Sequence, residues 1–204
     1  MATTTNYGWT TPDNTDLVKD GAAAIRTLGS SIDTSMNAAL GTKKAGMVLL
    51  NTTSFSGVAS QSINDVFSAT YTNYRIIINV QSATSQNEFL FRMRVAGSDD
   101  STSNYHSQLI TGNNTSVAGE RVSSATSGTL AQMTNNVSGV DAVFYKPFDT
   151  VRTIVTATSA NSLDTIRMRT IGSVLATSTS YTGFTIFGST QNITGSVSVY
   201  GLAI

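Results

Sequence analysis

The spacing of hydrophobic positions changes along the chain and divides it into three regions. Residues 1–14 are polar and irregular. Residues 15–41 have apolar positions three and four residues apart, the spacing that places them on one face of a helix. Over residues 46–204, apolar and polar residues alternate in short runs between Gly, Ser and Asn, which predicts β-strands joined by turns.

The helix predicted over residues 15–41 has a start signal and a narrow apolar seam. Thr15 is a suitable N-cap, and Asp16 and Asp20 lie near the first turn, where the helix dipole favours negative charge. The seam occupies positions 18, 21, 25, 28, 32, 35 and 39, and its large apolar members are Val18, Ile25, Leu28 and Ile32. This heptad spacing favours a trimeric helical neck. The alternative is a single amphipathic helix that lies on the β domain.

The β region contains about nine predicted strands. Their bounds are Met47–Asn51, Tyr74–Val80, Phe89–Val95, Tyr105–Thr111, Asp141–Tyr145, Thr150–Thr158, Thr165–Ile171, Tyr181–Phe187 and Gly195–Ala203. Alternation places Phe89, Phe91 and Met93 on one face of their strand, whereas the nearly continuous apolar run Tyr74–Val80 predicts a strand buried on both faces. Strands without intervening helices predict a mainly β fold, an antiparallel β-sandwich of jelly-roll type.

The composition limits the classes of partner. Charged residues make up 12% of the chain, and 12 Lys and Arg residues balance 12 Asp and Glu residues. Because nucleic-acid binding requires clustered basic residues, we expect no nucleic-acid partner. A chain with so few charges and no net charge tends to associate, which favours an oligomer. The chain has no cysteine, so it forms neither disulfides nor thiolate metal sites.

The sequence lacks the segments that direct proteins into or across membranes. The first residues have neither the positive nor the apolar part of a signal peptide, and no apolar run approaches the ~18 residues of a membrane span. We therefore expect synthesis in a cytoplasm and no membrane insertion.

Little of the chemistry that enzymes need is present. His106 is the single histidine, so no histidine or thiolate metal site is expected. A Gly-rich phosphate loop and a G-x-S-x-G motif are missing. We expect a protein that is not an enzyme and binds no metal or cofactor. The catalytic alternatives are a Ser-His-Asp set through His106 and a carboxylate pair for sugar hydrolysis. Asp99 and Asp100 are interpreted as a solvated loop tip.

Two similar tripeptides place arginines at alternate strand positions. Arg92 and Arg94 flank a methionine, as do Arg167 and Arg169. Alternation puts the members of each pair on one face of a strand. One interpretation is a polar groove for an acidic or hydroxylated glycan, or the charged lining of a trimer axis. The other is a solvent face on which the arginines pair with nearby carboxylates and contribute little.

The N-terminal segment carries a family resemblance. Residues 6–33, NYGWTTPDNTDLVKDGAAAIRTLGSSID, resemble the N-terminal module of many bacteriophage minor tail and tail-fibre proteins. The segments Phe184–Ser189 and Gly195–Leu202 are similar to the last hairpin of phage fibre β domains. The resemblance implies a homotrimeric virion protein, made in the bacterial cytoplasm, that docks to tail or baseplate proteins and presents a β head outward. The alternative is a purely structural baseplate, collar or head-decoration component without receptor binding.

The candidate contact residues follow from this arrangement. Tyr7, Trp9 and Pro12 are the bulky or stiff residues of the irregular docking peptide, although Trp9 can instead pack against its own helix. Receptor contacts, with a host-surface glycan as the candidate partner, are expected in the loops farthest from the helix: Gly97–Asn104, Gly112–Gly119 and Ser123–Gly128. The candidate side chains are Tyr105 and His106, at the edge of the first loop, and the arginines Arg92, Arg94, Arg167 and Arg169.

Overall fold

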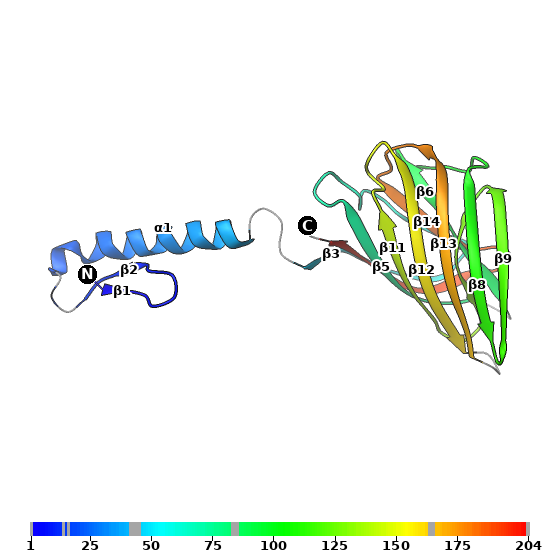
Figure 1. Cartoon of the computed structure of the whole chain (residues 1–204), viewed down its shortest axis with the longest axis horizontal. Helices are drawn as coiled ribbons and strands as arrows, with labels where there is room; N and C mark the ends of the chain where they lie inside the picture. Colours follow the sequence, from blue (N-terminus) through cyan, green and yellow to red (C-terminus); the bar gives the residue numbers. More distant parts are fainter. Residues whose placement is uncertain are drawn as a thin grey trace. The chain divides into compact units, whose positions relative to one another are not determined.

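The computed structural model describes residues 2–13, 15, 17–40, 46–82, 86–162 and 166–202. The chain divides into two compact units, Met1–Ala45 and Gly46–Ile204, which are described separately as the N-terminal module and the head (Figure 1). The predicted mainly β fold with one N-terminal α-helix is confirmed. Neither helical segment in the described residues is long and apolar enough to cross a membrane.

The N-terminal module consists of a short hairpin followed by a helix. Strands β1 (Ala2–Thr3) and β2 (Thr10–Thr11) pair antiparallel. A 3-10 turn, η1 (Val18–Asp20), leads into helix α1 (Gly21–Leu40). The first residues of the chain are therefore more ordered than the irregular peptide predicted from the sequence.

The helix begins later than predicted. Thr15 is not its N-cap, because the backbone amide and the hydroxyl of Thr15 both donate hydrogen bonds to Asp13 Oδ1 and close a local turn. Leu17 still has extended backbone angles, with φ −71° and ψ 134°. The predicted end of the helix at residue 41 lies outside the described residues.

The head is built from antiparallel strands in two sheets (Figure 1). Their bounds are β3 (Met47–Val58), β4 (Ser60–Ile63), β5 (Asn73–Ser82), β6 (Asn87–Val95), β7 (Ser98–Asp99), β8 (Tyr105–Asn113), β9 (Ser116–Ala125), β10 (Gly128–Met133), β11 (Ser138–Tyr145), β12 (Arg152–Ser162), β13 (Ile166–Ser178), β14 (Gly183–Gly188) and β15 (Ile193–Leu202). The larger, eight-stranded sheet has the order β3-β15-β5-β11-β12-β13-β8-β9. The smaller sheet has the order β10-β6-β14-β4, with β7 paired to β6.

The strand order is that of a jelly roll with two added hairpins. Strands β3, β15, β5 and β11 are neighbours in the larger sheet, and β4, β14, β6 and β10 are neighbours in the smaller one. Taken in chain order, these strands pass between the sheets in the Greek-key pattern of a jelly roll. The hairpins β8–β9 and β12–β13 are inserted between its strands and widen the larger sheet beyond β11. The predicted jelly-roll-like sandwich is thus confirmed.

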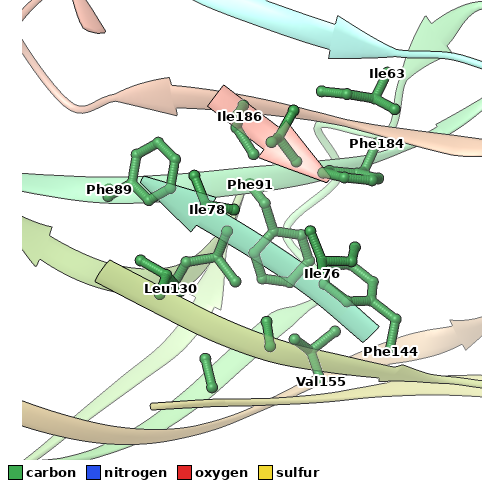
Figure 2. Packing of buried hydrophobic residues seen from close by; sticks show 14 of the residues in the cluster. Ile63, Ile76, Ile78, Phe89, Phe91, Leu130, Phe144, Val155, Phe184 and Ile186 are labelled. Atoms are coloured by element: carbon green, nitrogen blue, oxygen red, sulfur yellow. The ribbon is translucent and has the colours of Figure 1, made fainter. Parts of the chain in front are cut away.

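Aromatic and branched side chains from the two inner faces form one core. Figure 2 shows Phe91 and Phe184, from the smaller sheet, pointing toward Ile76 and Phe144, from the larger sheet. The Phe91 and Phe144 rings meet edge to face with centroids 5.3 Å apart, and those of Phe144 and Phe184 lie 5.4 Å apart. Burial of each such side chain contributes about 1.5–3 kcal/mol. The core therefore fixes which face of every strand points inward.

The opposite face of the larger sheet is not covered by any other described element of the head. On β5, Tyr74, Ile76 and Ile78 are buried, but Ile77 is only partly buried and Asn79 is exposed. The prediction that this strand is buried on both faces is therefore wrong for the single chain. The apolar run arose because Ile77, on the outward side, stands between the buried Ile76 and Ile78.

A glycine at a close approach of two strands provides a test of this packing. A Cβ at Gly195 would lie 2.0 Å from the backbone carbonyl oxygen of Asn79 on the neighbouring strand, whereas a Cβ at Gly139 would meet nothing within 4 Å. We expect Gly195→Ala to lower the free energy of unfolding by about 1–3 kcal/mol because backbone must move apart. Gly139→Ala should change it by less than about 1 kcal/mol. Urea denaturation of both variants checks this, and equal losses would contradict it.

Candidate functional site

Trp9 packs within the N-terminal module. Its indole Nε1 donates a hydrogen bond to the hydroxyl of Ser35 on α1 at 2.9 Å, and its ring stacks on that of Tyr7 with centroids 5.0 Å apart. The Trp9 backbone amide also donates to the hydroxyl of Thr4 at 2.9 Å, which closes the hairpin. The geometry therefore favours the self-packing alternative for Trp9. Tyr7 and Pro12 are exposed and remain candidates for docking.

The hairpin divides the apolar seam predicted on α1 into two sides. The partly buried helix residues lie on the side that Trp9 contacts: Gly21, Ala24, Leu28, Ser31, Ile32 and Ser35. Beside them, from η1 into α1, runs a second line of residues, called here the exposed stripe, at helical spacing: Val18, Ala22, Ile25, Gly29 and Met36, with the partly buried Ile32 at the border between the two sides. Val18 is 97% exposed, and Ile25 is 64% exposed. Of the predicted neck residues, Leu28 thus belongs to the covered side, and Val18 and Ile25 belong to the exposed stripe.

Tyr105 and Asp100 belong to a buried hydrogen-bond network in the head. The Tyr105 hydroxyl donates to the backbone carbonyl of Asp100 at 2.8 Å and accepts from the backbone amide of Met93 at 2.9 Å. The Asp100 carboxylate accepts from the hydroxyl of Tyr181 at 2.6 Å and from the backbone amide of Thr102 at 3.0 Å. Tyr105 has no exposed surface, so its predicted role as a receptor contact is wrong. Asp100 is half-buried and precedes the exposed residues Ser101–Ser103, so it combines a loop position with this structural contact.

Burial and hydrogen bonding shift the pKa values of this network in opposite directions. Burial raises the pKa of Tyr105, and burial together with the hydrogen bond to Asp100 raises the pKa of Tyr181. Burial disfavours the charged form of Asp100, but hydrogen bonds donated by Thr102 and Tyr181 outweigh it and lower the pKa of that carboxyl. At neutral pH the network therefore joins a carboxylate to protonated tyrosines, an arrangement that stabilises the loop.

Arg92 and Arg94 make local contacts at the same end of the smaller sheet. Arg94 forms an ion pair with Asp99 and donates from Nε to Asn64 Oδ1 at 2.8 Å. Arg92 donates from Nε to the backbone carbonyl of Thr126 at 3.0 Å, and its guanidinium carbon lies 4.8 Å from the centroid of a phenylalanine ring. These contacts correspond to the interpretation in which the arginines pair with nearby groups.

Arg167 and Arg169 lie in a different place. The Arg169 side chain is buried and its guanidinium lies 2.6 Å from Glu88 Oε2, while Arg167 donates to Gln132 Oε1. Gln132 in turn donates to Glu88 Oε1 at 3.1 Å. The four arginines are therefore divided between two clusters and do not line one groove. The buried Arg169 is unavailable as the glycan contact proposed from the sequence.

The register of the larger sheet places the candidate loops at opposite ends of the head. Met47, at the start of β3, pairs with Leu202, so we call this the chain-entry end and the opposite one the far end. The Gly97–Asn104 and Ser123–Gly128 loops adjoin the chain-entry end, because they flank Tyr105 and Ala125, which pair there. Two of the three loops predicted to contact a receptor therefore share the end of the head at which the chain enters. The turn within Gly112–Gly119, formed by Asn114 and Thr115, lies at the far end.

His106 is half-buried on the outward side of β8. Its Nδ1 accepts a hydrogen bond from the backbone amide of Ser124 at 3.3 Å. Within the described residues, no group of three or more histidine and acidic side chains is arranged to hold a metal ion.

Comparisons with known proteins supply no relative for this chain, since no protein-family model, curated protein or solved structure matches it. The fold, the exposed stripe and the surfaces of the head are therefore the observations from which a function is inferred.

The Asp100 network predicts a pH-dependent contribution to stability. Asp100→Ala removes a charged acceptor from a buried tyrosine and should lower the free energy of unfolding by about 1.5–3 kcal/mol at pH 7. Because the pKa of Asp100 is lower in the folded state, this contribution is present above the ordinary pKa of about 3.9 and is lost as pH falls through the folded-state value. Denaturation at pH 7 and pH 3 checks this. The exposed Asp149→Ala is the control, and a loss that is the same at both pH values would contradict the account.

Proposed function

We propose that this chain is a fibre-type component of a bacteriophage tail that associates as a homotrimer, docks to tail or baseplate proteins through its N-terminal module, and binds the host surface through its head. The observation that carries the proposal is the exposed stripe of α1. In water, a stripe with Val18 and Ile25 so exposed is unfavourable for an isolated helix, and its spacing suits association with copies of itself. The resemblance of residues 6–33 to phage tail modules supports the same assignment.

The head suits recognition more than catalysis. It is a rigid sandwich with a continuous core, and its titratable groups with shifted pKa values include Tyr105 and Tyr181, both buried in structural contacts. A binding role needs only a rigid scaffold and exposed loops, and we therefore propose a protein without enzymatic activity. The second candidate function is a purely structural virion component, which the buried arginine clusters favour because they stabilise the head and offer no groove.

The far end of the head is the surface that we assign to the host receptor. The β8–β9 turn at Asn114 and Thr115 is exposed there, and the β10–β11 and β14–β15 turns lie at the same end. These turns are rich in amide and hydroxyl side chains, which donate to and accept from sugar hydroxyls. Three copies of a weak glycan site on one fibre would bind with useful avidity.

Removal of the N-terminal module tests the docking assignment. Deleting residues 1–45 should leave a folded head with a strand-type circular dichroism spectrum and a cooperative urea transition, because the core residues all belong to Gly46–Ile204. The truncated protein should be absent from particles that incorporate the full chain, as measured by immunoblotting of purified virions. Incorporation of the truncated protein would contradict docking through the module.

A bulky group at each end of the head tests where the receptor binds. The chain has no cysteine, so Thr115→Cys at the far end and Ser103→Cys near the chain-entry end each provide a single site for a polymer-maleimide conjugate. Binding of the purified protein to host cells should be lost for the Thr115→Cys conjugate and retained for the Ser103→Cys conjugate. Equal binding of both conjugates would contradict the far-end assignment. No binding by the unmodified protein would favour the purely structural alternative.

A further inference from the structure

We infer that the outward side of the eight-stranded sheet, called here the outer face, is a self-association surface that binds a second copy of the head. This inference rests on the proposed homotrimer and specifies which surface of the head the copies share. It arises from apolar side chains that point away from the core on neighbouring strands.

The outer face carries aligned rows of apolar residues. Cross-strand pairing places one mainly apolar row at the chain-entry end, from β3 to β13: Met47, Leu202, Tyr145, Ile154 and Val174, with the polar Asn73 between Leu202 and Tyr145. Further along the strands lie Leu49, Val143, Ile77, Ile110 and Met168. Ile154 is 49% exposed and Met168 is 59% exposed. A solvent-facing side of an antiparallel sheet is ordinarily polar, so this composition indicates a face that becomes covered.

The shape of the outer face also suits a protein partner. Shallow hollows lie between the exposed side chains: one is lined by Met47, Val143 and Leu202, and another by Ile77, Gly139 and Met168. Small residues on the central strands, such as Gly139 and Gly172, leave room for side chains that project from an opposing surface.

The charges of the outer face favour a copy of the same chain over a charged partner. Arg75 and Asp141 lie near the centre of the face and neutralise each other, with Nε 2.9 Å from Oδ1. Two such faces can therefore approach without repulsion at this pair. Arg121 on the edge strand β9 and Arg152 at the start of β12 are further basic side chains with outward positions among the described residues, and both lie away from the centre of the face.

The outer face is close to the size of one stable interface, and a cyclic trimer divides it between two neighbours, so each contact is modest. With ~4.8 Å between its eight strands and ~20 Å along them, the face covers roughly 700 Å². One partner in a stable complex buries ~800 Å². A cyclic trimer needs two different patches on each copy. The outer face offers both, since Met47 and Leu49 lie on one side of the ion pair and Ile110 and Met168 lie on the other.

Chain connectivity brings copies of the outer face together. Residues 41–45 join α1 to the head, so Leu40 and Gly46 can be separated by at most ~22 Å. If α1 associates through its exposed stripe, the heads are held close to one another at an effective concentration on the order of millimolar. The apolar row at the chain-entry end then lies on the part of the face nearest the point where the chain enters.

The test uses the absence of cysteine from the natural chain. Two full-length variants, Thr158→Cys at the centre of the outer face and Ser60→Cys on β4 of the smaller sheet, each place one thiol at an exposed strand position. At a concentration where sedimentation shows an oligomer, the thiol of Thr158→Cys should react with a maleimide at least about tenfold more slowly than that of Ser60→Cys, because the face is covered most of the time. In 6 M guanidinium the two rates should be equal, which is the control for intrinsic reactivity.

A second pair of variants tests the energetic role of the outer face. Ile154→Lys introduces a charge on the face, and Val137→Lys introduces the same charge at a comparably exposed apolar residue in the β10–β11 turn. Ile154→Lys should weaken association in sedimentation equilibrium by at least about tenfold, while Val137→Lys leaves it unchanged. An oligomer with an accessible Thr158→Cys thiol and no effect of Ile154→Lys would overturn the inference but leave association through α1 intact. A monomeric full chain at micromolar concentration would overturn both.

Discussion

The contact of Phe91 and Phe184 with Phe144 across the two sheets is the interaction on which the rest of the head depends (Figure 2). Because strand side chains alternate, this contact determines the direction of every other residue along β6, β11 and β14. Cross-strand pairing imposes the same inward and outward directions of side chains on the strands of the added hairpins. The outer face is therefore a consequence of the core: once the aromatic rings point inward, residues such as Val143 and Ile154 must point outward.

The strands could be located from the sequence where alternation is strong. Phe89, Phe91 and Met93 predicted the inward side of β6 correctly, and all three are buried. Strands β4 and β9 were missed because they contain few large apolar residues. Both are edge strands: β4 lies at the edge of the smaller sheet, and β9 lies at the edge of the larger one. The prediction for β5 failed for the opposite reason. An apolar residue such as Ile77 indicates burial in the assembled protein as readily as burial in the single chain.

The candidate site was less predictable, because long-range contacts decide which polar residues are available. Tyr105 follows a loop rich in small polar residues, a position typical of a binding residue. Its hydroxyl instead satisfies the Met93 amide and the Asp100 carbonyl inside the sandwich. The burial of Arg169 could not be predicted either, because it depends on the contact with Glu88, which is 81 residues away in the sequence. By contrast, spacing alone located the helix, but it did not separate the positions that lie on the Trp9 side, such as Leu28, from those left exposed, such as Ile25.

The two interfaces proposed above, one on the neck and one on the head, would be more effective together than either would be alone. The exposed stripe of α1 contains Gly29 and Ala22 between its larger members, so a bundle formed by it buries little apolar area and is weak. The outer face is broad, but its polar threonines limit the apolar area that it offers. Because residues 41–45 join the two surfaces in one chain, formation of the first contact makes the second nearly intramolecular, and their free energies reinforce each other. A chain with no net charge, in which 12% of the residues are charged, would resist such association little.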